Sequence, residues 1–283
     1  MTSIERLAEM LGNNGPALVL TGAGCSTRSG IPDYRDENGD WKQRQPVMFG
    51  DFVKQAHVRR RYWAGSMNGW HRIETARPNP AHQSLARLEH SGHVHTLITQ
   101  NVDGLHRKAG SRNLIELHGN LEKVICLQCG VLYSRSRIQE WLLETNHDFL
   151  QERTAVAPDG DALLGERDYS EFNVPACMQC GGILKPDVVF FGENIPSERR
   201  AGCHEVLKKA GCLLVAGSSL MVFSGYRYCR EAARRGIPVA AINFGRTRGD
   251  DLYDLKINDE CGRVLSILEE YLRIPHLDHQ SIV

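Results

Sequence analysis

Short apolar runs that alternate with helix-like stretches constrain the fold of this chain more than any other feature. Apolar runs occur at residues 17–20, 188–191, 213–216 and 239–242, and each is followed within two residues by Gly or Asn. Stretches with helical spacing separate the later runs. Buried strands that alternate with helices form parallel sheets with helices on both faces. We therefore predict an α/β fold with a doubly wound, parallel, Rossmann-like sheet.

Two C-x-x-C pairs predict a metal site in a module that interrupts this sheet. The ligands are Cys126, Cys129, Cys177 and Cys180, and a glycine follows each pair. Four thiolates are a tetrahedral set for zinc, and they leave no coordination position open for catalysis. A redox pair and isolated surface thiols are the alternatives. Two pairs with matching glycines favour one structural zinc ion in a small zinc-binding and helical insertion.

Small and hydrogen-bonding residues occur where the apolar runs end. Gly22-Ala23-Gly24 follows the first run, and Gln100-Asn101-Val102-Asp103 follows an apolar segment at 93–99. In doubly wound sheets, ligands bind outside the carboxyl ends of the strands, where backbone amides can approach phosphates. These residues at the carboxyl ends of the predicted strands, which we call the rim, favour a dinucleotide site. A hydride-transfer dehydrogenase is the least favoured function, because the third glycine of its fingerprint would fall on Thr27.

Composition excludes several other classes of protein. Lys plus Arg and Asp plus Glu each number 34, so the formal net charge is zero and nucleic acid is not an expected partner. No apolar run reaches the roughly 18 residues that span a bilayer, so we expect no membrane association. The first residues resemble neither a signal peptide nor a transit peptide. Together with the nine cysteines, this predicts a cytoplasmic protein.

Eight motifs of this chain occur in the order in which the sirtuin family carries them. They are GAGCS (22–26), GIPDYR (30–35), TQNVDGLH (99–106), LHGN (117–120), the paired C-x-x-C, KPDVVFFGE (185–193), GSSL (217–220) and Cys261-Gly262. The chain therefore resembles the sirtuins, which are NAD-dependent protein-lysine deacylases, over almost its whole length. Within class II, NPAH (79–82), KAGSR (108–112) and APDGD (157–161) are most similar to the mitochondrial-type sirtuin 4 branch. That branch is associated with removal of lipoyl, biotinyl and other bulky acyl groups, and with ADP-ribosyl transfer.

The resemblance implies roles for individual residues at the rim. His118 would be the general base, and Asn101 and Asp103 would be further catalytic residues. The implied cofactors are NAD and one structural zinc ion. The residues implied to contact NAD are Gly22, Ala23, Gly24, Ser26, Ile31, Pro32, Asp33, Tyr34, Arg35, Gln100, Asn101, Val102, Asp103, Gly217, Ser218, Ser219, Asn243, Phe244, Gly245 and Cys261.

The same resemblance divides the chain into parts. Residues 1–120 and 188–274 would form the discontinuous NAD-binding domain, and 121–187 the zinc-binding module. Residues 32–78 would supply the cofactor loop and the helical part of the small domain, and 275–283 a C-terminal tail. The acyl-lysine substrate would bind as an added strand between 188–193 and the residues after Ser219. We expect a monomer.

His118 is chemically suited to the role that the resemblance gives it. NAD-dependent amide cleavage requires a ribose hydroxyl to lose a proton, and a histidine titrates near neutrality. Without the motifs, a histidine at the end of a strand, such as His118, is more often structural than catalytic. Asn101 and Asp103 could equally be turn residues, because Asn and Asp are common in turns. The motif set favours the catalytic interpretation, with nicotinamide and O-acyl-ADP-ribose as products. The alternatives are a mono-ADP-ribosyltransferase that uses the same site and a non-catalytic zinc-ribbon binding module.

The helix after the cofactor loop indicates which acyl groups are accepted. Sirtuins that prefer succinyl or malonyl groups carry a Tyr-x-x-Arg pair there, which binds the acyl carboxylate. In this chain the residue three positions after Tyr62 is Gly65, and the one after Trp63 is Ser66. We therefore predict poor removal of acidic acyl groups. Ala64 and Gly65 would leave room for bulkier neutral groups, with Trp63 as an apolar wall.

Overall fold

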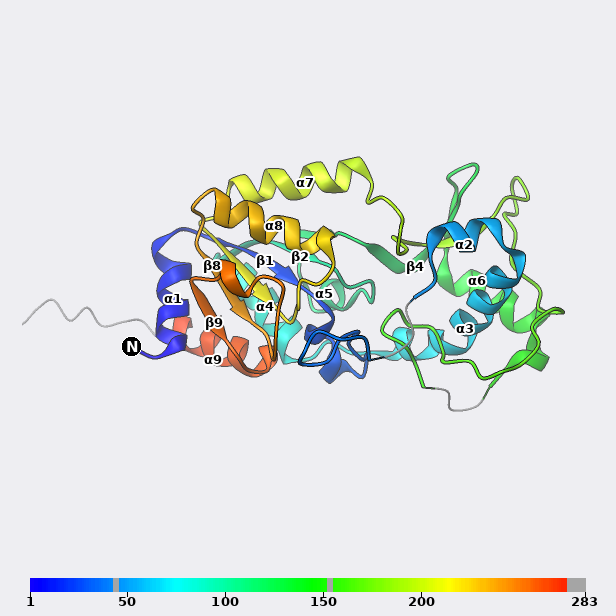
Figure 1. Ribbon diagram of the computed structural model, residues 1–283, viewed down its shortest axis with the longest axis horizontal. Helices are drawn as coiled ribbons and strands as arrows, with labels where there is room; N and C mark the ends of the chain where they lie inside the picture. Colours follow the sequence, from blue (N-terminus) through cyan, green and yellow to red (C-terminus); the bar gives the residue numbers. More distant parts are fainter. Residues whose placement is uncertain (43–45, 152–154, 274–283) are drawn as a thin grey trace, which may run out of the picture.

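A computed structural model describes residues 1–42, 46–151 and 155–273 of the chain. The molecule has two parts, a large sheet covered by helices and a smaller module at one end (Figure 1). The small module is built from segments that lie between strands of the large sheet in the sequence. No helix in these residues is both long and apolar enough to cross a membrane.

The large sheet has six parallel strands in the order β3-β2-β1-β7-β8-β9. The strands are β1 (Ala17–Thr21), β2 (Val94–Thr99), β3 (Leu114–Glu116), β7 (Cys212–Ala216), β8 (Val239–Ile242) and β9 (Leu255–Ile257). The order reverses between β1 and β7, which is the topological switch point where doubly wound sheets bind ligands. Every residue of β1 and β7 is buried, as expected for parallel strands covered on both faces. The predicted doubly wound sheet is confirmed.

Helices cover both faces of this sheet. On one face lie α1 (Ser3–Asn13), α4 (Pro80–His90) and α9 (Cys261–Arg273), which share one apolar core with it. On the other face lie α7 (Ser197–Lys208) and α8 (Phe223–Arg234), with a second core. Figure 1 shows α7 and α8 on the opposite side of the sheet from α9.

Helix α4 is tied to the first turn after β1 through its N-cap. The Asn79 side chain accepts a hydrogen bond from the Ala81 amide, and Pro80 occupies the first helical position. The Asn79 side-chain amide also donates to the Cys25 carbonyl at 2.8 Å. The cap therefore fixes the Gly-rich turn against α4.

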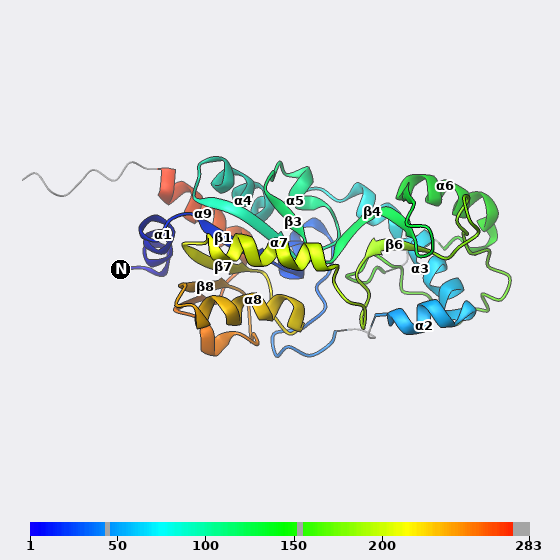
Figure 2. The same cartoon turned by 90° about the horizontal axis from the view of Figure 1, so that it is seen from above.

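The small module combines an antiparallel sheet with helices (Figure 2). Its strands are β4 (Gly119–Cys126), β5 (Leu132–Ser134) and β6 (Leu184–Val188), in the order β5-β4-β6. Its helices are α2 (Phe49–Lys54), α3 (Ala56–Thr75) and α6 (Arg135–Thr145). Phe52, Trp63, Ile138 and Leu142 pack together in its core. The remaining short elements are α5 (Leu105–Lys108), η1 (Ala23–Cys25), η2 (Thr27–Ser29), η3 (His147–Phe149) and η4 (Asp250–Leu252).

The sequence pattern wrongly predicts that the apolar run 188–191 is a strand of the parallel sheet. Residues 188–191 are not a strand of the parallel sheet, because β6 ends at Val188 and pairs antiparallel with β4. The Val189 amide then donates to the His118 carbonyl at 2.8 Å, and Phe190 and Phe191 turn toward a cavity. The run is apolar because it lines that cavity.

Candidate active site

A cavity of about 410 Å³ lies between the carboxyl ends of the large sheet and the small module. This volume is typical of small-molecule and cofactor sites. Most of the residues predicted to contact NAD lie in its wall together with His118. They are Gly22, Ala23, Gly24, Ser26, Ile31, Asp33, Tyr34, Arg35, Gln100, Asn101, Val102, Asp103, Gly217, Ser218, Ser219, Asn243 and Phe244.

Three predicted cofactor residues lie outside this wall. Pro32 and Gly245 flank it, and Gly245 packs with φ of +81° against Glu37. Cys261 begins α9 behind the Gly-rich turn, with its Sγ atom 3.7 Å from Cys25 Sγ. Cys25 is itself 1% exposed and does not line the cavity.

The Gly-rich turns after β1 and β7 fit together so closely that side chains are excluded. A Cβ at Gly22 would lie 2.7 Å from Ser218 Cβ, and one at Gly24 would lie 2.9 Å from the Gly217 carbonyl oxygen. The Gly24 amide donates to that carbonyl at 2.8 Å. Gly217 has a φ of +61°, which favours glycine. The result is a cavity wall made of backbone at the switch point, which fits close approach by a dinucleotide phosphate.

Arg35 supplies a positive charge to the cavity wall. Its guanidinium carbon lies 3.6 Å from the centre of the Trp41 ring, and its Nη1 donates to the Gly39 carbonyl at 3.1 Å. Burial lowers the pKa of Arg35 from its ordinary value. Stacking and this hydrogen bond hold the guanidinium in place beside the cavity.

A buried hydrogen-bond network orients the carboxylate of Asp103. The Ser26 hydroxyl donates to Asp103 Oδ2 at 2.7 Å, and Ser26 Oγ accepts from the Asn101 side-chain amide at 3.1 Å. His82 Nδ1 accepts from the Asn79 amide, so its Nε2 carries the proton and faces Ser26 Oγ at 3.5 Å. The Leu105 amide donates to Asp103 Oδ1 at 2.9 Å. Both carboxylate oxygens therefore have fixed donors.

Burial shifts the pKa values of the two ionisable groups in this network. It raises the pKa of Asp103 from its ordinary value, although the Ser26 hydrogen bond opposes the shift. It lowers the pKa of His82 to about 4. His82 is therefore neutral at physiological pH and acts in the network as a hydrogen-bond donor.

The ring of His118 is held in one tautomer. Its Nδ1 lies 2.9 Å from the Gln100 carbonyl oxygen, so Nδ1 must donate. Its Nε2 is then the acceptor, and it lies 2.8 Å from the Ser224 hydroxyl, which donates to it. Burial lowers the pKa of His118, the Gln100 carbonyl opposes this shift, and the positive charge of Arg199 adds to it. The ring is a neutral base at pH 7, with its lone pair at the cavity.

Several residues of this site were not found from the sequence. No sequence signal marks Ser224, because it lies in the first turn of α8 and meets His118 only through folding. Pro158 and Asp159 reach the cavity wall from the long segment between the cysteine pairs. His82 belongs to the NPAH motif, but no local pattern shows that it joins this network; it is fully buried.

The segment 157–162 fills the space that small residues of α3 were expected to leave open. The Ala162 amide donates to the Gly65 carbonyl at 2.9 Å. A Cβ at Gly69 would lie 2.0 Å from the Gly160 carbonyl oxygen. Trp63 is fully buried in the core, and the cavity wall here is formed by Tyr62, Ile73, Pro158 and Asp159. The expectation of a roomy pocket beside Ala64 and Gly65 is therefore wrong.

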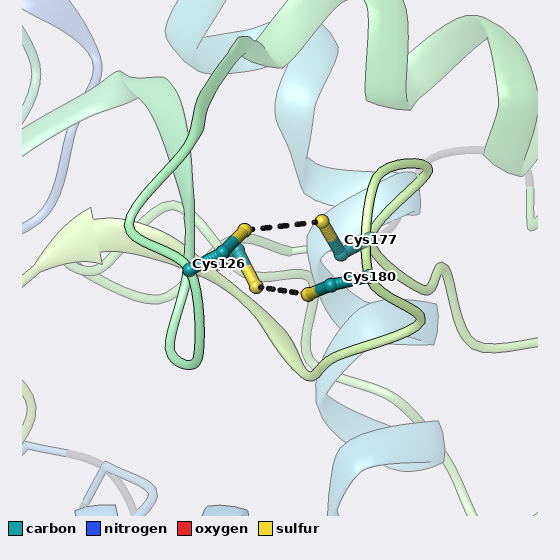
Figure 3. A group of neighbouring side chains, drawn as sticks. Cys126, Cys177 and Cys180 are labelled. Atoms are coloured by element: carbon teal, nitrogen blue, oxygen red, sulfur yellow. Dashed lines mark hydrogen bonds between the residues drawn. The ribbon is translucent and has the colours of Figure 1, made fainter.

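The four predicted metal ligands converge on one point. The sulfur atoms of Cys126, Cys129, Cys177 and Cys180 all lie within 4.8 Å of one another. Figure 3 shows side chains from the two turns pointing at each other, with Cys126 Sγ 3.5 Å from Cys180 Sγ and Cys129 Sγ 3.7 Å from Cys177 Sγ. Zn–S bonds of about 2.3 Å in a tetrahedron place sulfurs about 3.8 Å apart. The set fits one structural zinc ion and leaves no open position.

Comparison with known proteins identifies the family. The Sir2 family model matches residues 22–224. The "NAD-dependent protein deacetylase 2" of Bradyrhizobium diazoefficiens is 52% identical over 93% of this chain and 97% of its own length. The human "NAD-dependent protein lipoamidase sirtuin-4, mitochondrial" is 48% identical over 89% of this chain and 81% of its own length. A solved structure of Sir2 with a p53 peptide and NAD+ has a TM-score of 0.77 at 31% identity, and the match covers 96% of this chain and 98% of that one. This chain belongs to the Sir2 family, and the sirtuin resemblance is confirmed.

Proposed function

We propose that this protein is an NAD-dependent protein-lysine deacylase that releases nicotinamide and O-acyl-ADP-ribose. One observation carries the proposal: His118 is held as a neutral base on the wall of a cavity that the Gly-rich turn also lines. Relatives of about 50% identity are NAD-dependent protein deacetylases by name, which supports the same activity.

The residues of the rim fit NAD. The backbone at Gly22, Gly24 and Gly217 leaves room for the phosphates, and Arg35 offers them a cation. The oriented Asp103 carboxylate would accept from the nicotinamide amide. When bound, NAD supplies a ribose carbon that becomes electrophilic as nicotinamide leaves.

His118 then accepts a proton. Its Nε2 lone pair faces the Ser224 hydroxyl, so a ribose hydroxyl that displaced this serine would find the acceptor already aligned. The Gln100 carbonyl holds the Nδ1 proton and stabilises the imidazolium that forms. The same base would serve the alternative activity, which is mono-ADP-ribosyl transfer to protein side chains. This activity stays a second candidate because the chain resembles the sirtuin 4 branch, to which the human lipoamidase relative belongs.

The acyl-lysine peptide would be added as a strand between 188–193 and the residues after Ser219. Val189, Phe190, Met221 and Val222 line the cavity from the two sides. Solved relatives include Sir2 bound to acetylated peptide, which supports this arrangement. The added strand would use backbone hydrogen bonds for affinity, so many substrate sequences would be accepted.

The acyl end of the cavity favours neutral groups. No arginine follows Tyr62 at the third position, and the half-buried Asp159 carboxyl that lines the wall offers no positive charge to an acyl carboxylate. We expect kcat/KM to be lower for succinyl-lysine peptides than for matched octanoyl or lipoyl peptides, with acetyl intermediate or weak. A succinyl value above both would show that another residue supplies the positive charge.

We assign the NAD-binding domain to 1–120 and 188–274, the zinc-binding module to 121–187, and the cofactor loop with its helices to 32–78. All six strands of the parallel sheet fall within the first two ranges, which supports the division. Residue 274 and the tail 275–283 lie outside the described residues. None of the nine cysteines has a disulfide partner, which supports a cytoplasmic location.

The decisive test is nicotinamide release with NAD and a panel of acylated lysine peptides. Mass spectrometry of the products separates the candidates: O-acyl-ADP-ribose in solution indicates deacylation, and ADP-ribose on protein indicates ADP-ribosyl transfer. No nicotinamide release with any acyl peptide or protein acceptor would leave the non-catalytic zinc-ribbon alternative.

A further inference from the structure

We propose that the mouth of the cavity carries a binding surface for acidic residues of the substrate protein, next to the acyl-lysine. This α8 arginine patch consists of Arg227, Arg230 and Arg248, gathered around Phe223. The proposal rests on the proposed function, because it concerns the protein substrate of the same site.

The three arginines surround one aromatic ring. Their guanidinium carbons lie 5.1 Å (Arg227), 5.3 Å (Arg230) and 5.7 Å (Arg248) from the centre of the Phe223 ring. Arg227 and Arg230 are three positions apart on α8, so they share a helix face. Arg248 comes from the loop after β8 and also lies 4.5 Å from the Tyr226 ring. Folding therefore brings three like charges from two segments into one patch.

In the part of the chain that the structure describes, these arginines have no acidic partner, unlike the arginines at the C-terminal end of the helix. Arg234 and Arg235 both pair with Glu231. Within 1–42, 46–151 and 155–273, none of the three patch arginines forms an ion pair, and the buried Arg227 Nε has no hydrogen-bond partner at all. Like charges held together repel one another, and an external anion would relieve that repulsion. The patch is thus complementary to negative charge.

The patch lies beside the expected path of the substrate strand. Phe223 and Arg227 line the cavity, and the neighbouring Ser224 donates to His118. Arg248 supports the peptide-facing segment directly, because its amide donates to the Ser219 carbonyl at 2.8 Å and its Nη1 to the Met221 carbonyl at 3.3 Å. Figure 1 shows the N-terminal end of α8 directed toward the small module.

The geometry favours a peptide carboxylate as the occupant. An extended strand advances about 3.3 Å per residue, so side chains within about four residues of the acyl-lysine can reach an adjoining patch. Phe223 is 41% exposed, which gives the chain an apolar surface between the cations. The N-terminus of the 12-residue α8 adds positive potential at the same place. We infer that glutamate or aspartate near the acyl-lysine increases substrate affinity.

The test compares matched acyl-lysine peptides that carry Glu or Gln on either flank. In the wild-type protein at low salt, kcat/KM should be about 3- to 10-fold higher for the Glu peptide of the preferred flank, mainly through KM, and 0.5 M NaCl should abolish the difference. Arg230→Glu should abolish or reverse the preference while retaining turnover of the Gln peptide and the KM for NAD, because Arg230 lies outside the cavity wall. Arg234→Gln, whose arginine is paired with Glu231, is the matched control and should keep the preference.

The outcomes separate the patch from the site itself. Equal kcat/KM for Glu and Gln peptides on both flanks, or a preference that survives unchanged in Arg230→Glu, would overturn the proposal. A raised KM for NAD without a change in peptide preference would assign the patch to the nucleotide instead and also overturn it. Failure to turn over any peptide would reject the proposed function rather than the patch.

Discussion

Replacing Gly69 by alanine should displace the segment 157–162, which we propose closes the acyl end of the cavity. The new Cβ would lie 2.0 Å from the Gly160 carbonyl oxygen and 2.7 Å from the Ala162 amide nitrogen. Both atoms belong to the backbone, so no rotamer change relieves the overlap. The carbonyl would have to move about 1 Å to reach the 3.0 Å limit below which Cβ contacts are essentially absent. Pro158 and Asp159 would move with it, since they belong to the same turn and line the cavity.

Two effects of opposite sign set the change in stability. Overpacking of this kind costs about 1–3 kcal/mol. Alanine in place of glycine within a helix recovers about 1 kcal/mol. We therefore expect a net loss of about 0–2 kcal/mol, and Tm falls by about 2–4 °C for each kcal/mol lost. The larger effect should be on specificity, because a misfit of one methylene group in a pocket changes kcat/KM by about tenfold or more.

The measurement is kcat/KM on acetyl, octanoyl and lipoyl peptides of one sequence, together with Tm. The ratio of lipoyl to acetyl activity should shift about tenfold in Gly69→Ala. Gly50→Ala is the matched control, because Gly50 lies in a helix of the same module with nothing within 4 Å of its Cβ position. If Gly69→Ala keeps both the wild-type Tm and the wild-type acyl ratio, the segment 157–162 does not form the end of the acyl pocket.

Three further predictions follow from His118 and the cysteine cluster. His118→Ala should retain NAD binding by calorimetry and lose about 10²–10⁴-fold in deacylation, and near wild-type turnover would show that it is not the base. Because burial lowers the pKa of His118, the acid limb of the pH profile of kcat/KM should lie below pH 6.5. Arg199→Gln removes a positive charge that also lowers this pKa, so the acid limb should move to higher pH. An acid limb at the same pH in the variant would contradict this. Cys177→Ser should lower zinc content and Tm together, and stoichiometric zinc with unchanged melting would refute the four-cysteine site.

The features predicted correctly from the sequence are those that local patterns determine. An apolar run followed by Gly22-Ala23-Gly24 predicts a buried strand and a tight turn, since a side chain at Gly22 or Gly24 would collide with the turn after β7. The two C-x-x-C pairs predict their convergence because four thiolates in this spacing suit one ion. The apolar run 188–191 misled the prediction, because a residue that lines a cavity is as apolar as one in a buried strand.

Contacts between distant segments carry no local signal. Ser224 lies 106 positions from His118 in the sequence, and no pattern within α8 announces that its hydroxyl will meet the ring. Asp159 and Asp161 look like ordinary turn residues, yet in the folded chain both are half-buried: Asp159 lines the cavity, and Asp161 packs beside Gly65 and Gly69. Burial raises the pKa of Asp161 well above its ordinary value, and this follows only from the folded position.

Gln100 shows how the base depends on the switch point of the sheet. Its carbonyl fixes the tautomer of His118, and its side-chain amide donates to the Thr21 carbonyl at 3.1 Å and to Ser218 Oγ at 2.8 Å. Thr21 ends β1 and Ser218 follows β7, so both strands that flank the switch point hold the residue that orients the base. A Cβ at Gly225 would lie 2.3 Å from the Gln100 amide oxygen, so α8 packs directly against the Gln100 side chain. The proton acceptor and the backbone wall expected to bind phosphate are therefore parts of one hydrogen-bonded structure, and a substitution that separates the two turns should impair both functions together.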